Sequence, residues 1–228
     1  MSIADNFKTV IDRIAAVAKR AGRDISTIKL IVVTKTVDPV RIREAVAAGA
    51  MILGENRVQE AKEKFERLGS IASWHLIGHL QTNKAKYAVK FFNMIHSVDH
   101  IDLAREIDRQ AAKTRKVQNV LIEVSIAGEE AKAGVTIEGV TDLLKEAAKL
   151  KNIAIKGLMT MPPFSDDPEK ARPYFRKLRE LAEAIVKDNT PNVCMQELSM
   201  GMSGDFEVAI EEGATMVRVG TAIFGERT

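Results

Sequence analysis

Several features are scarce in this sequence, and each scarcity excludes a class of protein. The chain has a single cysteine, Cys194, among 228 residues, so it cannot form an internal disulfide, and a reducing, cytoplasmic location is expected. No hydrophobic run approaches the roughly 18 consecutive residues that a membrane span requires. The net charge is only +3, because 34 Lys plus Arg are balanced by 31 Asp plus Glu. Since both signs are interspersed along the chain, we expect neither a nucleic-acid partner nor a membrane-binding surface.

Side chains suited to metal or nucleophilic chemistry are also few. Cys194 lies in a short apolar stretch and is interpreted as a buried strand residue rather than a nucleophile. The sequence has four histidines: His75, His79, His96 and His100. Their arrangement is not interpreted as a set of metal ligands, so we expect no zinc site. His75 and His96 fall in predicted strands and are interpreted as core residues, and His100 falls near a predicted helix start.

The abundant signal is an alternation between short apolar runs and longer segments with helical spacing. Apolar residues from Ile3 to Ala18 recur at helical spacing, which predicts an amphipathic helix that stays on the mature protein. Eight apolar runs follow: Leu30 to Thr34, Met51 to Gly54, Trp74 to Ile77, Met94 to Val98, Val120 to Ile126, Ile155 to Met159, Val193 to Leu198 and Met216 to Val219. This alternation predicts parallel strands buried on both faces. We therefore expect an α/β fold, a single (β/α)8 TIM-type barrel over residues 1–228 with an extra N-terminal helix.

Helix boundaries in the sequence support one continuous domain. Asp38-Pro39 and Asp167-Pro168 each place a capping residue before a proline at the first helical position. Gly49, Gly69 and Gly213 stand where helices must stop before the next strand. The proline-rich segment 162–168 lies between a predicted strand and the helix that follows it. It is therefore interpreted as a barrel loop and not as a linker between domains. In this fold, functional residues lie at the C-terminal ends of the strands.

Lys35 directly follows the apolar run of the first predicted strand. Partial desolvation at a strand end would lower the pKa of its amine and make it a candidate for covalent attack on an aldehyde. An exposed lysine that begins a loop has the same sequence context, and from this residue alone that interpretation is favoured. The choice between the two interpretations of Lys35 therefore depends on the residues at the ends of the other predicted strands.

Two loops have the composition of a phosphate site. The segment Ser199-Met200-Gly201-Met202-Ser203-Gly204-Asp205 follows the seventh predicted strand and opens a helix, so its amides and hydroxyls could surround an anion. The segment Arg218-Val219-Gly220-Thr221 ends the eighth strand. Each alone is consistent with an ordinary turn. Together they favour phosphate binding, because loops after strands seven and eight commonly hold phosphate in barrels of this class.

Three further polar residues lie at or just after the ends of predicted strands. For each of them the sequence allows both a functional and a purely structural interpretation. Arg218 is the charged residue of an apolar strand, so its guanidinium either approaches a ligand or forms a salt bridge inside the barrel. Asn56, after the second strand, is either a helix cap or a ligand contact. His79 follows Gly78 after the third strand and is a candidate general base, although a surface loop histidine is the favoured interpretation.

Six motifs occur together in one order along the chain. They are Val33-Thr34-Lys35-Thr36, Gly54-Glu55-Asn56-Arg57-Val58-Gln59-Glu60, the segment from Trp74 to Lys84, Gly157-Leu158-Met159-Thr160-Met161, the segment from Leu198 to Asp205, and the segment from Arg218 to Gly225. In this combination the sequence resembles the pyridoxal phosphate homeostasis protein family. The resemblance runs from the first predicted strand to the C-terminus. One small departure is Thr34, where the family often has serine before the lysine.

The resemblance implies a fold and a role for each matching position. The family is similar to the N-terminal barrel of alanine racemase, the third fold type of pyridoxal phosphate (PLP) proteins. Lys35 would form a Schiff base with the cofactor, Arg218 would approach its pyridine nitrogen, and Asn56 would line its pocket. The phosphate would be held by five residues of the two loops: Ser199, Gly201, Ser203, Gly220 and Thr221. Met200, in the first of these loops, is also expected to contact the cofactor.

The resemblance also implies a protein that buffers or delivers PLP, and the residues favour this over catalysis. An arginine beside the pyridine nitrogen disfavours a second positive charge there, which weakens the ring as an electron sink. Alanine racemase takes a second base, a tyrosine, from the extra β-domain of a partner subunit, and we expect this chain to be too short for that domain. Its own tyrosines, Tyr87 and Tyr174, lie in predicted outer helices.

Alternatives remain open at this point. A PLP-dependent amino-acid racemase is the main alternative to a carrier. A phosphosugar isomerase on the same barrel would fit the phosphate loops, but it leaves Lys35 unexplained and lacks a clear glutamate base. For the carrier, we expect PLP as ligand, apo PLP-dependent enzymes as candidate recipients, and a monomer, as is usual for the family.

Overall fold

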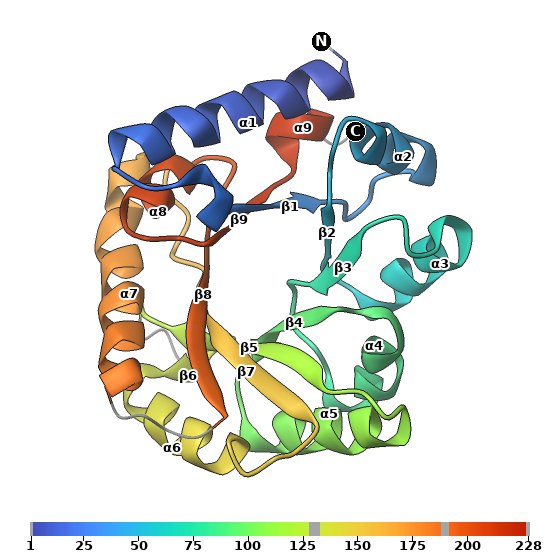
Figure 1. Cartoon of the computed structure of the whole chain (residues 1–228), viewed down its shortest axis with the longest axis vertical. Helices are drawn as coiled ribbons and strands as arrows, with labels where there is room; N and C mark the ends of the chain where they lie inside the picture. Colours follow the sequence, from blue (N-terminus) through green and yellow to red (C-terminus); the bar gives the residue numbers. More distant parts are fainter. Residues whose placement is uncertain (1, 128–132, 188–191, 227–228) are drawn as a thin grey trace.

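The computed structural model describes residues 2–127, 133–187 and 192–226. Within them, eight parallel strands form a closed barrel (Figure 1). They are β1 (Lys29–Val33), β2 (Ile52–Glu55), β3 (Ser73–Leu76), β4 (Met94–Val98), β5 (Gln118–Ser125), β7 (Ile153–Met159), β8 (Val193–Met202) and β9 (Met216–Val219). Neighbours along the chain pair with one another, and the β1–β9 pairing closes the ring. The short strand β6 (Val135–Thr136) pairs beside the end of β5. The predicted TIM-type barrel is confirmed.

Helices follow the strands and form the outer layer of the ring in Figure 1. They are α1 (Ile3–Arg20), α2 (Pro39–Ala47), α3 (Val58–Leu68), α4 (Ala85–Phe91), α5 (Ile101–Lys113), α6 (Ile137–Ala147), α7 (Arg172–Lys187), α8 (Phe206–Glu211) and α9 (Thr221–Phe224), with 3-10 turns at Ile25–Thr27, Thr82–Lys84 and Pro168–Ala171. Asp38 caps α2 with Pro39 at its start, as predicted. No helix of the described segments combines the length and hydrophobicity needed to cross a membrane.

The extra N-terminal helix α1 lies across the outside of the barrel, where it packs against α2, α8 and α9. Ser2 and Asp5 form a reciprocal capping box at its start. Its apolar face, which includes Phe7, Val10 and Ile14, is buried. This helix therefore covers the β9–β1 side of the barrel, next to the loops predicted to bind phosphate.

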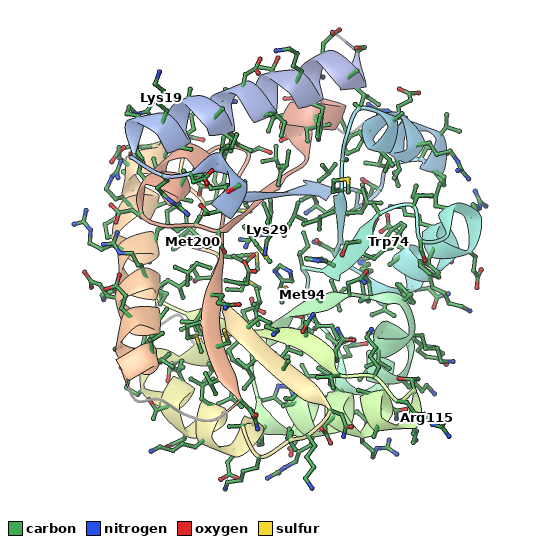
Figure 2. The ribbon with its side chains drawn as sticks, in the orientation of Figure 1. Lys19, Lys29, Trp74, Met94, Arg115 and Met200 are labelled. Carbon is green, nitrogen blue, oxygen red and sulfur yellow. The ribbon has the colours of Figure 1, made fainter. Side chains whose placement is uncertain are left out.

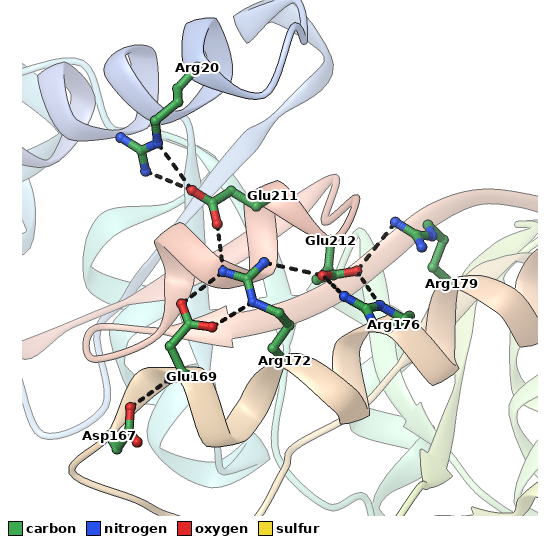
Figure 3. Close-up of polar contacts among 8 residues, drawn as sticks. All are labelled: Arg20, Asp167, Glu169, Arg172, Arg176, Arg179, Glu211 and Glu212. Atoms are coloured by element: carbon green, nitrogen blue, oxygen red, sulfur yellow. Dashed lines mark hydrogen bonds and ion pairs between the residues drawn. The ribbon is translucent and has the colours of Figure 1, made fainter.

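An ion-pair network joins α1, α7 and α8 (Figure 3). Glu211, in α8, lies 2.8 Å from Arg20 and 2.7 Å from Arg172. The following residue, Glu212, is buried and lies 3.2 Å from Arg172 and 3.0 Å from Arg176. Networks of several charges stabilise more than isolated surface pairs, because the ordered side chains are shared. The network holds α8, the helix that follows the loop Ser203–Asp205.

Side chains fill the interior of the barrel and leave it without a pore. The cluster enclosed by the strands is mainly aliphatic and consists of Ile31, Val33, Ile77, Met94, Leu121, Met159 and Met216. At the N-terminal end of the strands, Lys29 forms an ion pair with Glu197, which also accepts a hydrogen bond from Thr215. In Figure 2, Lys19 and Arg115 project from the outer surface instead. Since this end of the barrel is filled, ligand access is from the C-terminal ends of the strands.

Contact between β7 and β8 depends on Gly157. The pairing register shifts between Ile155 and Gly157, which brings the two backbones unusually close. A Cβ atom on Gly157 would lie 1.8 Å from the carbonyl oxygen of Glu197. Any side chain at this position therefore requires the strands to separate.

We predict that Gly157→Ala lowers the free energy of unfolding by about 2 kcal/mol or more, because the added methyl group overlaps the backbone of β8. Urea unfolding followed by circular dichroism measures this difference. The control is Gly204→Ala, where an added Cβ meets no atom within 4 Å. The control variant should stay within about 0.5 kcal/mol of wild type. Equal stability of the two variants would contradict the assigned close approach.

Candidate functional site

A cavity of about 480 Å³ opens at the C-terminal ends of the strands, as the barrel fold predicts. Its polar lining includes most of the residues singled out in the sequence: Lys35, Asn56, His79, Ser203, Arg218, Gly220 and Thr221. Val33, Ile77, Met161, Pro163 and Phe164 add apolar walls. Parts of the chain that are almost 190 residues apart in sequence thus meet in one space.

Lys35 directly follows β1 and is half-buried at the mouth of this cavity. The residue after it, Thr36, has a φ of 61°, which is rare for a β-branched side chain. The chain therefore turns sharply at the lysine. This turn leads the backbone away to α2 while Lys35 remains part of the cavity lining.

Asn56 lines the cavity and does not cap a helix. The N-cap of α3 is Arg57, which makes no side-chain capping bond. Gly78 is the reason that the loop after β3 can approach Asn56, because a Cβ atom there would lie 2.5 Å from the Asn56 carbonyl oxygen. Of the two interpretations of Asn56, the helix cap is therefore wrong, and the ligand contact stays a prediction for a residue of the cavity wall. His79, next to Gly78, is an exposed loop residue that also reaches the cavity.

The two glycine- and serine-containing loops meet on one side of the cavity. The Gly220 amide donates to the Ser203 hydroxyl at 3.3 Å, which joins the loop after β8 to the loop after β9. Thr221 lies beside them as the first residue of α9. Asp205 also lines the cavity, but its carboxylate accepts a hydrogen bond from the Met202 amide at 2.6 Å. Burial raises the pKa of Asp205, against the opposing effects of that bond and of Arg218.

Arg218 is the buried cation of the site. Its side chain is only 3% exposed, and it donates to the Ser199 hydroxyl at 2.7 Å and to the Thr160 carbonyl at 3.0 Å. It forms no ion pair within the described segments, so the alternative of a salt bridge inside the barrel is not observed there. Burial lowers the pKa of Arg218 to about 10, while Asp205 and Glu123 act in the opposite direction. The guanidinium therefore remains charged at neutral pH.

A chain of buried hydrogen bonds continues from Arg218 across the barrel. Ser199 Oγ lies 3.0 Å from His96 Nδ1, and His96 Nε2 lies 3.0 Å from His75 Nδ1. Burial lowers the pKa of His75 to about 3 and lowers that of His96 well below its ordinary value. Both histidines are buried, as predicted. They are neutral at pH 7, so they add no charge beside Arg218.

Ser199, Met200 and Gly201 lie behind the cavity and do not line it. Ser199 acts through Arg218, and Met200 is fully buried in the core between the strands and the helices. Gly201 has a φ of 89° and allows α8 to approach closely, since a Cβ there would lie 2.5 Å from Ala209 Cβ. These three residues were predicted to contact the cofactor, but they lie behind Arg218 and the loop after β8 and do not line the cavity.

The buried carboxyl group of β5 was not singled out from the sequence. Glu123, in β5, is 3% exposed, and burial together with Asp99 raises its pKa to about 7. The signal was available, because a glutamate interrupts an otherwise apolar predicted strand. No cluster of three or more His, Cys, Asp or Glu side chains in the described segments could hold a metal ion.

Cys194 and the two tyrosines lie away from the cavity. Cys194 is half-buried in β8, less enclosed than its apolar sequence context predicted. Tyr87 and Tyr174 belong to the outer helices α4 and α7, as predicted, and neither lines the cavity. The polar groups that line the cavity are therefore the Lys35 amine, the Arg218 guanidinium, the Asn56 amide, the His79 imidazole, the Asp205 carboxylate, and hydroxyl and backbone N–H groups of the two loops.

The sequence and the structure of this chain are similar to those of known proteins over almost their full length. Residues 6–228 match the family model described as alanine racemase, N-terminal domain. A curated protein of Aquifex aeolicus named pyridoxal phosphate homeostasis protein is 49% identical over 228 residues, which is 100% of this chain and 99% of that protein. A similar solved structure is PipY of Synechococcus elongatus with PLP bound, at 37% identity and a TM-score of 0.83, covering 95% of this chain and 100% of PipY.

The fold extends to the racemases themselves. Alanine racemase of Clostridium difficile has a TM-score of 0.75 at 16% identity, covering 98% of this chain and 57% of the racemase. At that identity the likeness concerns the fold alone. The full-length identity to the curated relatives is the stronger finding, and by it this chain belongs to the pyridoxal phosphate homeostasis protein family.

Proposed function

We propose that this protein binds PLP covalently through Lys35 and serves to hold and release the cofactor. The observation that carries the proposal is that one cavity joins a strand-end lysine, a buried arginine and two loops rich in hydrogen-bond donors. The naming of the curated relatives and the PLP bound to PipY support it.

The residues present fit the chemical groups of PLP. Ser203, Thr221 and the backbone around Gly220 supply hydroxyl and N–H groups for the phosphate, and a volume of about 480 Å³ is within the usual range of roughly 300–1,000 Å³ for small-molecule sites. Arg218 would approach the pyridine nitrogen, and Asn56 would line the pocket. The aldehyde of PLP would condense with the Lys35 amine, forming a carbon–nitrogen double bond and releasing one water. Attack by another amine would transfer that double bond to the incoming nitrogen and restore the Lys35 amine.

Arg218 favours holding over catalysis. Because its guanidinium stays charged, protonation of a nitrogen beside it would place two positive charges together. Ser199 and the neutral His96 fix the guanidinium without neutralising it. A racemase also needs a second base across from the lysine, and neither Tyr87 nor Tyr174 lines the cavity. The amino-acid racemase is therefore the less favoured function, and its candidate base would be His79.

We predict that Lys35→Ala abolishes the adduct that borohydride reduction traps between the protein and PLP, because the variant has no amine at this position. Peptide mapping by mass spectrometry identifies the modified lysine. Lys84→Ala, in the 3-10 turn between β3 and α4, is the control and should keep the adduct. A Lys35-independent adduct on Lys84, or on Lys132, which lies outside the described residues, would contradict the assignment.

A second prediction concerns the phosphate loops. The double change Ser203→Ala and Thr221→Ala should weaken binding of PLP by at least about tenfold, because charge-assisted hydrogen bonds contribute roughly 1.5–3 kcal/mol each. Binding of pyridoxal, which has no phosphate, should change little. Fluorescence titration of both compounds measures the effect. Equal losses for the two compounds would show that these hydroxyls do not act on the phosphate.

A third prediction separates a carrier from a racemase. With alanine or serine in deuterated buffer, we expect no α-proton exchange above that of free PLP, because Arg218 weakens the electron sink. The cofactor should instead pass to a competing amine or to an apo PLP-dependent enzyme while the protein stays folded. Mass spectrometry of the amino acid measures the exchange. Clear exchange that disappears in Lys35→Ala would support a racemase and direct attention to His79.

A further inference from the structure

Lys64 is a buried cation with no direct part in the cavity. It lies on α3, its side chain is 7% exposed, and its ammonium group has three protein acceptors. Nζ donates to the Thr34 carbonyl at 2.5 Å, to Glu55 Oε1 at 2.8 Å and to Glu60 Oε1 at 2.6 Å. An ammonium group has three N–H donors, so each of them has an acceptor. A buried charge is tolerated only when it is satisfied in this way, so the position of Lys64 is tied to the positions of its three acceptors.

The first of those acceptors is the residue that precedes Lys35. Thr34 is fully buried, and its carbonyl accepts from Lys64 while its hydroxyl donates to Glu55 at 2.6 Å. Its amide donates to the Gly54 carbonyl in the neighbouring strand at 2.9 Å. All polar groups of Thr34 are therefore engaged, and the peptide group leading into Lys35 is fixed.

The same cluster holds the residue that follows Lys35. The Thr36 amide donates at 2.5 Å to Glu60 Oε1, the oxygen that also accepts from Lys64. This bond stabilises Thr36 in its left-handed conformation, which a threonine seldom adopts. The peptide groups on both sides of Lys35 are thus bound to one cluster on β2 and α3.

The charges of the cluster agree with its geometry. Burial pushes the pKa of Glu60 upward, but hydrogen bonds from Lys64 and the Thr36 amide are stronger and hold it below its ordinary value. Burial raises the pKa of Glu55, and its second oxygen, Oε2, is buried without a hydrogen-bond partner in the described segments. Glu60 is therefore the carboxylate that carries the contact from Lys64 to Thr36.

We propose that Lys64 is a positioning residue for Lys35: together with Glu60 it fixes the backbone on both sides of Lys35 and so sets the direction from which the amine meets an aldehyde in the cavity. This inference rests on the proposed function, because it assigns a role only if Lys35 is the residue that reacts. Bond formation requires the amine to approach the carbonyl carbon along a narrow range of directions. A lysine on a loosened backbone would spend less time in that range.

The test compares Lys64→Met, which keeps the length of the side chain and removes the charge, with Lys62→Met. Lys62 lies on the same helix in a solvent-exposed pair with Glu66 at 3.5 Å. We measure the rate at which Lys35 is trapped by borohydride after mixing with PLP. We also measure the affinity for pyridoxamine 5′-phosphate, which has the same ring and phosphate but no aldehyde. Circular dichroism confirms that each variant is folded.

We expect Lys64→Met to slow trapping about tenfold or more, while its affinity for pyridoxamine 5′-phosphate stays within about twofold of wild type. Lys62→Met should match wild type in both measurements. An unchanged trapping rate in folded Lys64→Met would overturn the inference. A parallel loss of pyridoxamine 5′-phosphate affinity would also overturn it, because the effect would then be a general disruption of the cavity.

A second pair of variants keeps the inference testable if Lys64→Met does not fold. Glu60 is partly exposed, so its replacement disturbs the core less. Glu60→Ala removes the acceptor of the Thr36 amide and should slow trapping, whereas Glu60→Gln retains an acceptor oxygen and should restore most of the rate. Equal rates in Glu60→Ala and wild type would overturn the inference. No adduct at Lys35 in the wild-type protein would instead contradict the proposed function.

Discussion

The buried guanidinium of Arg218 is the constraint around which the site is organised. A charge that is 3% exposed needs hydrogen-bond acceptors, and its two partners in the described segments are neutral: the Ser199 hydroxyl and the Thr160 carbonyl. The neutral pair His96 and His75 extends the chain and adds no counter-charge. The cavity therefore receives a positive charge that is fixed in place and that no direct ion pair within residues 2–127, 133–187 and 192–226 cancels.

Much of the architecture could be predicted from the sequence, because it depends on local and repeating patterns. Each strand buried on both faces reads as an apolar run, so the barrel and several strand limits, such as Met94–Val98, were predicted correctly. Met51 was placed in a strand and is instead 75% exposed before β2, since hydrophobicity alone does not tell a strand end from a loop. Lys35, Asn56 and Arg218 could be proposed because strand ends converge in this fold.

The remainder of the site depends on packing between distant segments, which no local pattern encodes. The loop after β8 was singled out as one unit, yet Ser203 reaches the cavity while Met200 lies in the core, because Met200 is still within β8 and Ser203 is in the turn beyond its end. Lys64 and Glu60 read as one of many helical lysine–glutamate pairs, like Lys62 and Glu66. Only the tertiary structure brings the first pair against the backbone at Lys35.

The central claim is that the cavity binds PLP at Lys35 and that Arg218 keeps the cofactor ring in the form suited to storage and release. The protonation state of the pyridine nitrogen tests this claim most directly. Nitrogen-15 NMR of the protein loaded with PLP labelled at that nitrogen distinguishes the two forms. The account predicts the chemical shift of an unprotonated nitrogen throughout the neutral pH range. The shift of a protonated pyridinium would contradict it.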